Sequence, residues 1–195
     1  MKPVFLKIRR LAKPFLDTRH NDAHTEISTQ LAFDLLERES GDEDIVIPAI
    51  ILHDTGWKLV PAELHLKAFG PKATKPELNR LHEFGGVKIA KEILQGINYD
   101  PAKSESILEI IDGHDSRTEP LSLNDMIVKD ADKLWRYTKS GFHIDIERFG
   151  QSYEEGLERL RSNLSGWFFT VAASKLATEK LSKREKEKTA EFGTA

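Results

Sequence analysis

The sequence predicts one all-α domain, a bundle of about six to eight helices. Three observations support this fold class. Apolar residues recur at spacings of three, four and seven over long segments, which places them on one face of a helix. No alternation of apolar and polar residues is sustained as it would be in strands, and there is no internal repeat. The length of 195 residues is enough for one domain with a sizeable core.

The first part of the chain contains three helix signals. Residues 4–13 predict a short helix that closes before a proline. Asp22 is expected to cap a helix that runs to about Ser40, where a glycine follows. A third helix fits residues 44–54, and Pro48 is expected to delay its regular start by a residue or two.

The rest of the chain is predicted as helices separated by irregular segments. Residues 55–75 contain glycines, prolines and a lysine-rich patch, so we expect a loop with at most one or two helical turns. Residues 139–150, which include Gly141 and Gly150, are also expected to be irregular. Helices are expected over residues 76–94, 101–113, 121–138 and 152–182.

These signals divide the chain into three parts. Residues 1–19 form a basic helical segment, which is expected to pack on the domain while its lysines and arginines stay in water. Residues 20–182 form the helical domain. Residues 183–195 form a charged tail that is expected to be disordered.

Composition excludes several classes of protein. Charged residues make up 31% of the chain and the net charge is -3, so there is no basic excess and no nucleic-acid partner is expected. The absence of cysteine excludes disulfides, thiolate metal sites and cysteine nucleophiles, and it favours the reducing cytoplasm. No apolar run approaches the roughly 20 residues of a membrane span, so neither a transmembrane segment nor a secretory signal is expected. The possibility that the chain forms a homo-oligomer stays open.

Several histidines share one pattern. Four of the seven lie on the apolar side of four different predicted helices. Glycine adjoins three of them and allows a close backbone approach. The four are His24, His53, His82 and His114. The other three have no such pattern and are expected at the surface or in local hydrogen bonds; they are His20, His65 and His143.

A shared metal site explains the four inward imidazoles better than four separate core positions. A single buried histidine is more often a core residue with a hydrogen-bond partner. Burying four without partners would cost roughly 1–3 kcal/mol each, and a metal ion removes that cost. Imidazole with carboxylate is the ligand set of Mn, Fe, Co, Ni or Zn, and Mg²⁺ is a further candidate. The accompanying carboxylates are Asp54, Asp115, Asp130 and Asp132.

The order of these residues resembles the HD superfamily of metal-dependent phosphohydrolases. His24 is followed by His53-Asp54 in the segment LHDTGW and then by Asp132 in the segment ADKL. The resemblance covers about residues 20–138. It implies an HD-type helical bundle in which these four residues hold one divalent metal.

The resemblance also implies further ligands. His82 and His114 stand in the chain order where members with two metals carry their additional histidines. The implied ligand set for one or two ions is therefore His24, His53, Asp54, His82, His114 and Asp132.

The function implied by the resemblance is hydrolysis of a small phosphorylated substrate, as a phosphomonoester or a phosphodiester. Nucleotides and their derivatives are the commonest substrates among the relatives. Asp54 would bridge two metals and is expected to be catalytic, together with Lys58, which stands where some relatives carry a lysine. A dinuclear iron oxygenase of the HD type and a non-catalytic nucleotide-binding domain stay open as alternatives, as does a helical domain without metal.

Four cations near the motif are candidates for binding the substrate phosphate. Each of them could instead be a solvated surface charge. They are Lys58, Arg117, Lys133 and Arg136.

Two aspartates compete for the last ligand position. Asp130 and Asp132 lie equally far from the centre of the buried face of their helix, so periodicity does not separate them. The resemblance selects Asp132, which follows an alanine and precedes Lys133 and a leucine. Asp130 is then expected to accept a hydrogen bond from a residue that supports the metal ligands, or to form an ion pair with Lys133 or Arg136.

Overall fold

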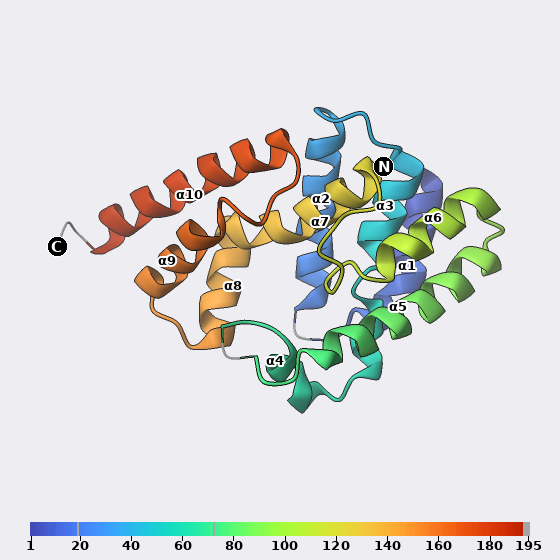
Figure 1. Cartoon of the computed structure of the whole chain (residues 1–195), viewed down its shortest axis with the longest axis horizontal. Coiled ribbons are helices and arrows are strands. Elements are labelled where there is room, and N and C mark those ends of the chain that lie inside the picture. Colours follow the sequence, from blue (N-terminus) through green and yellow to red (C-terminus); the bar gives the residue numbers. More distant parts are fainter. Residues whose placement is uncertain (19, 72, 193–195) are drawn as a thin grey trace.

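The structure is a computed structural model that describes residues 1–18, 20–71 and 73–192, with side chains as far as residue 187. Within these residues it contains α-helices and short 3₁₀ helices and no strand, so the all-α prediction is confirmed. The described residues form ten α-helices, a few more than the six to eight expected. Figure 1 shows α2, α3 and α7 near the middle of the molecule, with α5 and α6 on one side and α8, α9 and α10 on the other.

The helices follow one another with short connections. The α-helices are α1 (Pro3–Ala12), α2 (Asn21–Leu36), α3 (Glu43–Leu52), α4 (His65–Ala68), α5 (Glu77–Gly96), α6 (Pro101–Ile111), α7 (Leu123–Leu134), α8 (Lys139–Phe149), α9 (Tyr153–Asn163) and α10 (Val171–Phe192). The 3₁₀ helices are η1 (Lys13–Phe15), η2 (Thr55–Leu59), η3 (Ala62–Leu64) and η4 (Trp135–Tyr137).

Helix α3 is the centre of the core. It contacts α1, α2, α6 and α7, and every residue from Val46 to Leu52 is buried. A helix that is apolar on all sides is stable only when other helices surround it. Among the described residues no single helix is long and apolar enough to span a membrane; one pair bent by 106°, Glu43–Leu59 with Ala62–Ala68, passes that test on length and composition alone.

Two helix starts differ from the prediction. Helix α2 begins after His20, whose side chain makes no capping bond, so Asp22 lies inside the first turn and is not the cap. Helix α3 is regular from Glu43, before Pro48. Because proline has no N–H, the carbonyl of Asp44 loses its partner in the helix, and the hydroxyl of Tyr99 donates to that carbonyl at 2.7 Å instead.

The basic N-terminal segment belongs to the same core. Phe5, Ile8 and Ala12 of α1 are fully buried there, against α3 and α5. Arg9 and Arg10 are exposed. The segment therefore packs on the domain with its charges in water, as the sequence predicts.

Helix α8 covers Lys139–Phe149, so the prediction that residues 139–150 are irregular is wrong. The Thr138 hydroxyl accepts a bond from the Gly141 N–H at 3.1 Å and caps the helix. Gly141 lies against the backbone of Trp135, where a side chain would not fit. Gly150 ends the helix with φ +60°. The two glycines permit packing and termination of a helix, and they do not break it.

The long helix predicted over 152–182 is two helices, α9 and α10. Ser152 and Glu155 form a capping box at the start of α9, and residues 164–170 connect the two helices. Helix α10 continues as far as Phe192, so the tail expected to be disordered from residue 183 is helical within the described residues. Residues 193–195 lie outside the described residues.

A close approach of two backbones fixes η2 against α5. A Cβ atom added to Gly56 would lie 1.8 Å from the carbonyl oxygen of His82 and 2.4 Å from the Gly86 nitrogen. Neither backbone atom can move without moving α5. Since η2 directly follows His53-Asp54, this contact sets the distance between those residues and His82.

Replacing Gly56 with alanine is expected to destabilise the fold by about 1–3 kcal/mol or more, because the added methyl overlaps backbone atoms. The melting temperature should fall by about 2–4 °C for each kcal/mol in a chain of this size. Gly96→Ala is the matched control, since nothing lies within 4 Å of its added Cβ. Equal melting temperatures for the two variants would contradict this packing.

Candidate metal centre

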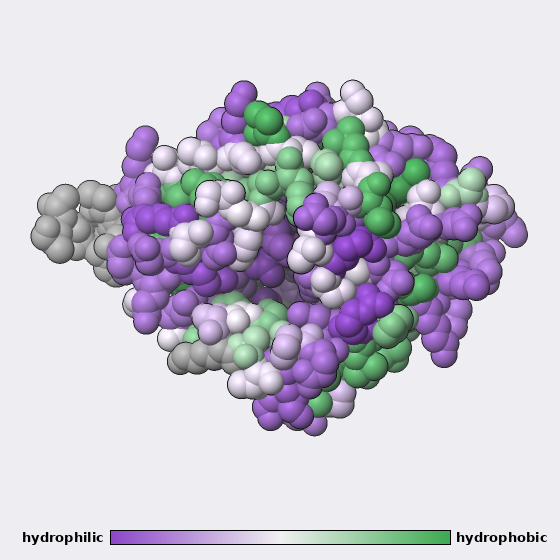
Figure 2. Space-filling model, viewed as in Figure 1, coloured by the Kyte–Doolittle hydropathy of each residue, from purple (hydrophilic) through white to green (hydrophobic). Residues whose placement is uncertain are grey.

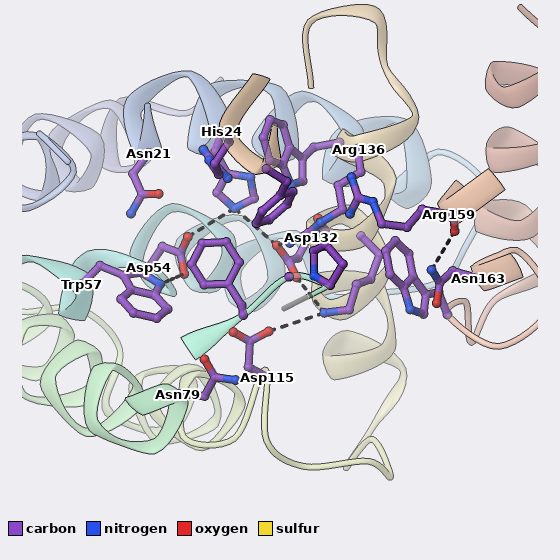
Figure 3. A pocket seen from close by; sticks show the side chains of 18 residues that line it. Asn21, His24, Asp54, Trp57, Asn79, Asp115, Asp132, Arg136, Arg159 and Asn163 are labelled. Atoms are coloured by element: carbon purple, nitrogen blue, oxygen red, sulfur yellow. Dashed lines mark hydrogen bonds and ion pairs between the residues drawn. The ribbon is translucent and has the colours of Figure 1, made fainter. Parts of the chain in front are cut away.

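Histidine and aspartate side chains from five parts of the fold point to one place. His24 comes from α2 and Asp132 from α7, on facing helices. His53-Asp54 follows the last turn of α3, and His82 lies in α5. His114 and Asp115 stand in the turn after α6. Figure 3 shows His24, Asp54, Asp115 and Asp132 facing the same space.

One group of side chains surrounds His24 and His53. Their Nε2 atoms lie 3.1 Å apart. Asp132 Oδ1 lies 3.3 Å from Nε2 of His24 and 3.7 Å from Nε2 of His53. Asp54 Oδ2 lies 3.4 Å from Nε2 of His24. These are the four residues of the H…HD…D order.

A second group surrounds His82 and His114, whose Nε2 atoms lie 3.2 Å apart. Asp115 Oδ2 lies 3.6 Å from Nε2 of His82 and 3.9 Å from Nε2 of His114. Asp54 Oδ1 lies 3.8 and 3.6 Å from the same two nitrogens. The carboxylate of Asp54 therefore belongs to both groups.

The donor set fits metal ions. Ligand atoms held about 2.0–2.2 Å from one ion stand about 3.0–3.6 Å from each other, close to the spacings in both groups. Nδ1 of His53 lies 2.8 Å from the Ile50 carbonyl, and Nδ1 of His114 lies 2.9 Å from the Ile111 carbonyl. A carbonyl only accepts, so each Nδ1 carries a proton, and each Nε2 is the atom that would present a lone pair to a bound metal ion. Each group could hold a metal ion, and Asp54 would be a ligand common to both.

The charges of the site are arranged for cations. Burial alone would raise the pKa of Asp54, but His53 and the other surrounding histidines hold it well below its usual range. Burial, with His114 nearby, lowers the pKa of His82 to about 4, so this imidazole is neutral at pH 7. Burial opposes protonation of His114 too, but the carboxylates of Asp54 and Asp115 raise its pKa to about 9. A metal ion at His114 would displace that proton.

Buried polar side chains hold the turn that carries His114. Gly113 takes φ +106°, a conformation open to glycine, and lets the chain turn after α6. The ammonium of Lys129 donates to the carbonyls of Gly113 and His114 at 2.9 and 2.7 Å. The buried carboxylate of Glu83 accepts from the N–H groups of Asp115 and Ser116 at 2.9 and 2.8 Å. The second group of ligands is thus fixed by its surroundings.

A family model decides the identity of this helical domain. The model of the HD domain matches residues 21–136, which contain every residue of both groups. The chain belongs to the HD domain family. Comparison with curated proteins and with solved structures gives no significant match. The predicted resemblance is confirmed, and with it the assignment to a superfamily of metal-dependent phosphohydrolases.

A cavity of about 380 Å³ adjoins the candidate metal ligands of the HD domain, and four of them, His24, Asp54, Asp115 and Asp132, line it. Figure 2 shows a hollow near the centre of one face, with hydrophilic residues inside it. Its lining combines carboxylates, cations, amides and aromatic rings. The residues are Asn21, His24, Asp54, Trp57, Phe69, Gly70, Pro71, Asn79, Asp115, Asp132, Lys133, Trp135, Arg136, Arg148, Phe149, Arg159, Asn163 and Trp167. The cavity joins the metal residues to helices α8 and α9, which lie beyond the family match.

The predicted phosphate-binding cations separate into two pairs. Lys133 and Arg136 line the cavity, and Lys133 Nζ lies 3.1 Å from Asp132 Oδ2 and 3.4 Å from Asp115 Oδ1. Lys58 is exposed on η2 and does not line the cavity. Arg117 turns away and donates to Asp125 at 3.0 Å. Of the four predicted cations, Lys133 and Arg136 therefore lie in the cavity, and Lys58 and Arg117 lie outside it.

Asp130 lies away from the metal residues, contrary to prediction. Its carboxylate accepts bonds from the N–H groups of Phe169 and Thr170 at 2.8 and 2.9 Å and from the Thr170 hydroxyl at 2.7 Å. It therefore holds the start of α10 and pairs with neither Lys133 nor Arg136.

The three histidines without a pattern lie outside both groups. His20 is exposed, and His143 is half-buried beside Phe142 and Tyr153. His65 is buried and not at the surface, with its Nε2–H donating to the Val60 carbonyl at 2.8 Å. The prediction of a local hydrogen bond thus holds for His65.

Three functional candidates were absent from the implied ligand set and from the predicted substrate-binding cations. Asp115 stands beside His114 and completes the second group; its adjacency to a ligand was the available signal. Arg148 and Arg159 line the cavity from α8 and α9. No local pattern marks these two arginines, because they approach the metal residues only through the packing of the last helices.

Proposed function

We propose that the protein is a metal-dependent hydrolase of a small phosphate ester, most directly a nucleotide or nucleotide derivative. One observation carries the proposal: the carboxylates of the metal centre and four cations line the same cavity. The cations are Lys133, Arg136, Arg148 and Arg159. The carboxylates can hold the metals while Lys133, which lies between Asp115 and Asp132, binds the reacting phosphoryl group. The three arginines add positive charge further along the cavity, which attracts a phosphorylated substrate.

Each part of the centre has a separate task in this reaction. When bound, two divalent cations would supply an attacking hydroxide near neutral pH and stabilise charge on the phosphoryl oxygens. Asp54 Oδ2 faces His24, and Oδ1 faces the other three histidines. This one side chain therefore connects the two groups of ligands. Lys133 lies between Asp115 and Asp132 and faces the cavity, where it can donate to a phosphoryl oxygen.

Aromatic side chains support a nucleotide or another flat substrate. Trp57 stacks on His82 with ring centroids 4.0 Å apart, and its indole N–H donates to Asp54 at 3.1 Å. Phe69 and Phe149 meet edge to face at 5.9 Å. All three rings border the cavity; Trp57 is almost fully buried, and the half-buried rings of Phe69 and Phe149 offer apolar surface to a base.

The direct test is release of phosphate from a panel of nucleotides and simple phosphate esters, with Mn, Co, Ni, Mg or reduced Fe added. Hydrolysis is expected with at least one metal and is expected to cease with a chelator. His53→Ala should reduce it to background, because a buried ligand is lost. His143→Ala is the matched control and should keep full activity, since His143 packs beside Phe142 and Tyr153.

Two outcomes would contradict the proposal. No phosphate release from the panel with any metal would exclude the hydrolase. Oxygen uptake by the iron-loaded, reduced protein in the same experiment would instead favour the dinuclear iron oxygenase.

A further inference from the structure

Three arginines converge on one buried carboxylate at the far side of the cavity. Asp145 is 1% exposed. Its oxygens lie 2.9 Å from Nη2 of Arg159, 3.3 Å from Nη1 of Arg148 and 3.5 Å from Nε of Arg136. Burial lowers the pKa of Arg148, although Asp145 acts in the opposite direction. Three guanidinium groups around one carboxylate leave this region with more positive than negative charge.

Aromatic rings hold the guanidinium groups. A ring lies within cation–π distance of each arginine and contributes to its position beside Asp145. The distances to the ring centroids are 5.2 Å for Arg159 over Phe149, 5.6 Å for Arg148 over Trp135, and 5.7 Å for Arg136 over Trp167. A ring accepts no conventional hydrogen bond at these distances, so the contact with Phe149 does not occupy the N–H groups of Arg159.

One of these donors lacks a partner in the structure. Nε of Arg159 is buried and makes no hydrogen bond. The side chain of Arg159 is 13% exposed and lines the cavity, beside Asn163. Figure 3 shows Arg136, Arg159 and Asn163 on the side of the cavity opposite Trp57 and Asn79. A buried donor next to excess positive charge is a place for an anion.

The arginine cluster is adjacent to the metal centre. Arg136 joins the two, since its Nη1 lies 3.9 Å from Asp132 Oδ1 while its Nε lies 3.5 Å from Asp145 Oδ2. A single guanidinium group therefore separates a metal-binding carboxylate from the carboxylate at the centre of the cluster. One small ligand can reach both.

We propose that Arg148 and Arg159, with Arg136, form a second anion-binding subsite that takes a non-reacting phosphate of the substrate. The inference rests on the proposed function, which places the reacting phosphoryl group at the metal centre. It narrows the substrate class to small esters with two phosphate groups a short distance apart, such as a diphosphate or a nucleoside bisphosphate. Arg148 and Arg159 are positioning residues for that second group.

The first test measures binding without chemistry. Calorimetry compares methylenediphosphonate, which can occupy both places, with methylphosphonate, which has one anionic group. Arg159→Gln is expected to weaken diphosphonate binding about ten-fold or more and to leave methylphosphonate binding within about two-fold. Arg161→Gln is the control from the same helix; Arg161 pairs with Glu154 and Glu185 at the surface.

The second test uses turnover of matched esters. Arg159→Gln should raise the KM of a nucleoside 3′,5′-bisphosphate about ten-fold with little change in kcat, and it should leave the corresponding 5′-monophosphate unaffected. Arg159→Lys keeps the positive charge but lacks the planar guanidinium group with its paired N–H donors. Its KM for the bisphosphate should therefore lie between those of the unaltered protein and Arg159→Gln. Arg148→Gln is a second variant with the same expectation, and the melting temperature of each variant shows whether it is folded.

The outcomes separate this inference from the proposed function. Equal losses for the one-phosphate and two-phosphate ligands in both arginine variants would overturn the subsite. Diphosphonate binding that equals methylphosphonate binding in the unaltered protein would overturn it as well. Failure to hydrolyse any ester, together with diphosphonate binding that depends on Arg159, would reject the hydrolase and retain the subsite.

Discussion

A chain with Asp54→Ala is expected to bind neither metal ion and to release no phosphate. The physical reason is that one carboxylate serves both groups of ligands: Oδ2 lies 3.4 Å from His24, and Oδ1 lies 3.6 Å from both His53 and His114. Loss of an outer partner already weakens metal affinity about 10–100-fold, so loss of a shared ligand should exceed 100-fold. Elemental analysis of the purified variant measures the number of ions per chain.

Variants that lose a ligand from only one of the two groups provide the comparison for Asp54→Ala. His24→Ala removes a ligand of the first group, and Asp115→Ala removes one of the second, so each is expected to leave one ion. Because Asp54 also accepts a bond from the Trp57 indole, circular dichroism is needed to show that Asp54→Ala stays folded. An Asp54→Ala protein that keeps a full complement of ions would show that this carboxylate is not the bridge.

The candidate metal ligands could be predicted from the sequence because each lies in a helix or shortly after the end of one. His24 and His82 point inward by helix periodicity, and the order of the HD motif supplied the partners. The structure then added what periodicity cannot give, the distances between residues on different helices. The separation of His53 from His82, for instance, follows from the contact of Gly56 with the α5 backbone.

The substrate side of the cavity could not be predicted in the same way. Arg148 and Arg159 lie on helices beyond the matched residues 21–136 and have no sequence signature. Gly141 and Gly150 read as breakers of regular structure, yet one packs against Trp135 and the other ends α8. Tertiary packing decides the role of a glycine, and a local pattern does not contain that information.

Closeness in sequence to a candidate ligand does not place Lys58 or Arg117 in the cavity. Lys58 stands four residues after Asp54, but η2 buries Gly56 and Trp57 and leaves the lysine outside. Arg117 stands near His114, but its guanidinium donates to the Asp112 carbonyl at 2.6 Å and to Asp125. A tight turn changes the direction of a side chain within two residues, so neighbours of a ligand need not face the ligand's site.

Asp132→Asn and Asp130→Asn, two substitutions two residues apart, are expected to have opposite kinds of effect. Asp132 Oδ1 lies 3.3 Å from Nε2 of His24. Burial alone would raise the pKa of Asp132, but Lys133 and the histidines hold it well below its usual range, so it is ionised at neutral pH. The asparagine at 132 removes that charge from a ligand position, and metal content and phosphate release should both fall sharply.

Asp130→Asn is expected to lower the stability of the fold and to leave the metal ligands in place. The Asp130 carboxylate accepts three bonds from Phe169 and Thr170 at the start of α10, and an amide NH₂ would face those donors with donors of its own. Loss of buried hydrogen bonds of this kind costs about 1–3 kcal/mol, which lowers the melting temperature by several degrees. Metal content at a temperature where the variant is folded should equal that of the unaltered protein. If metal titration showed the weaker binding in Asp130→Asn, the ligand would lie two residues earlier than the geometry of α7 indicates.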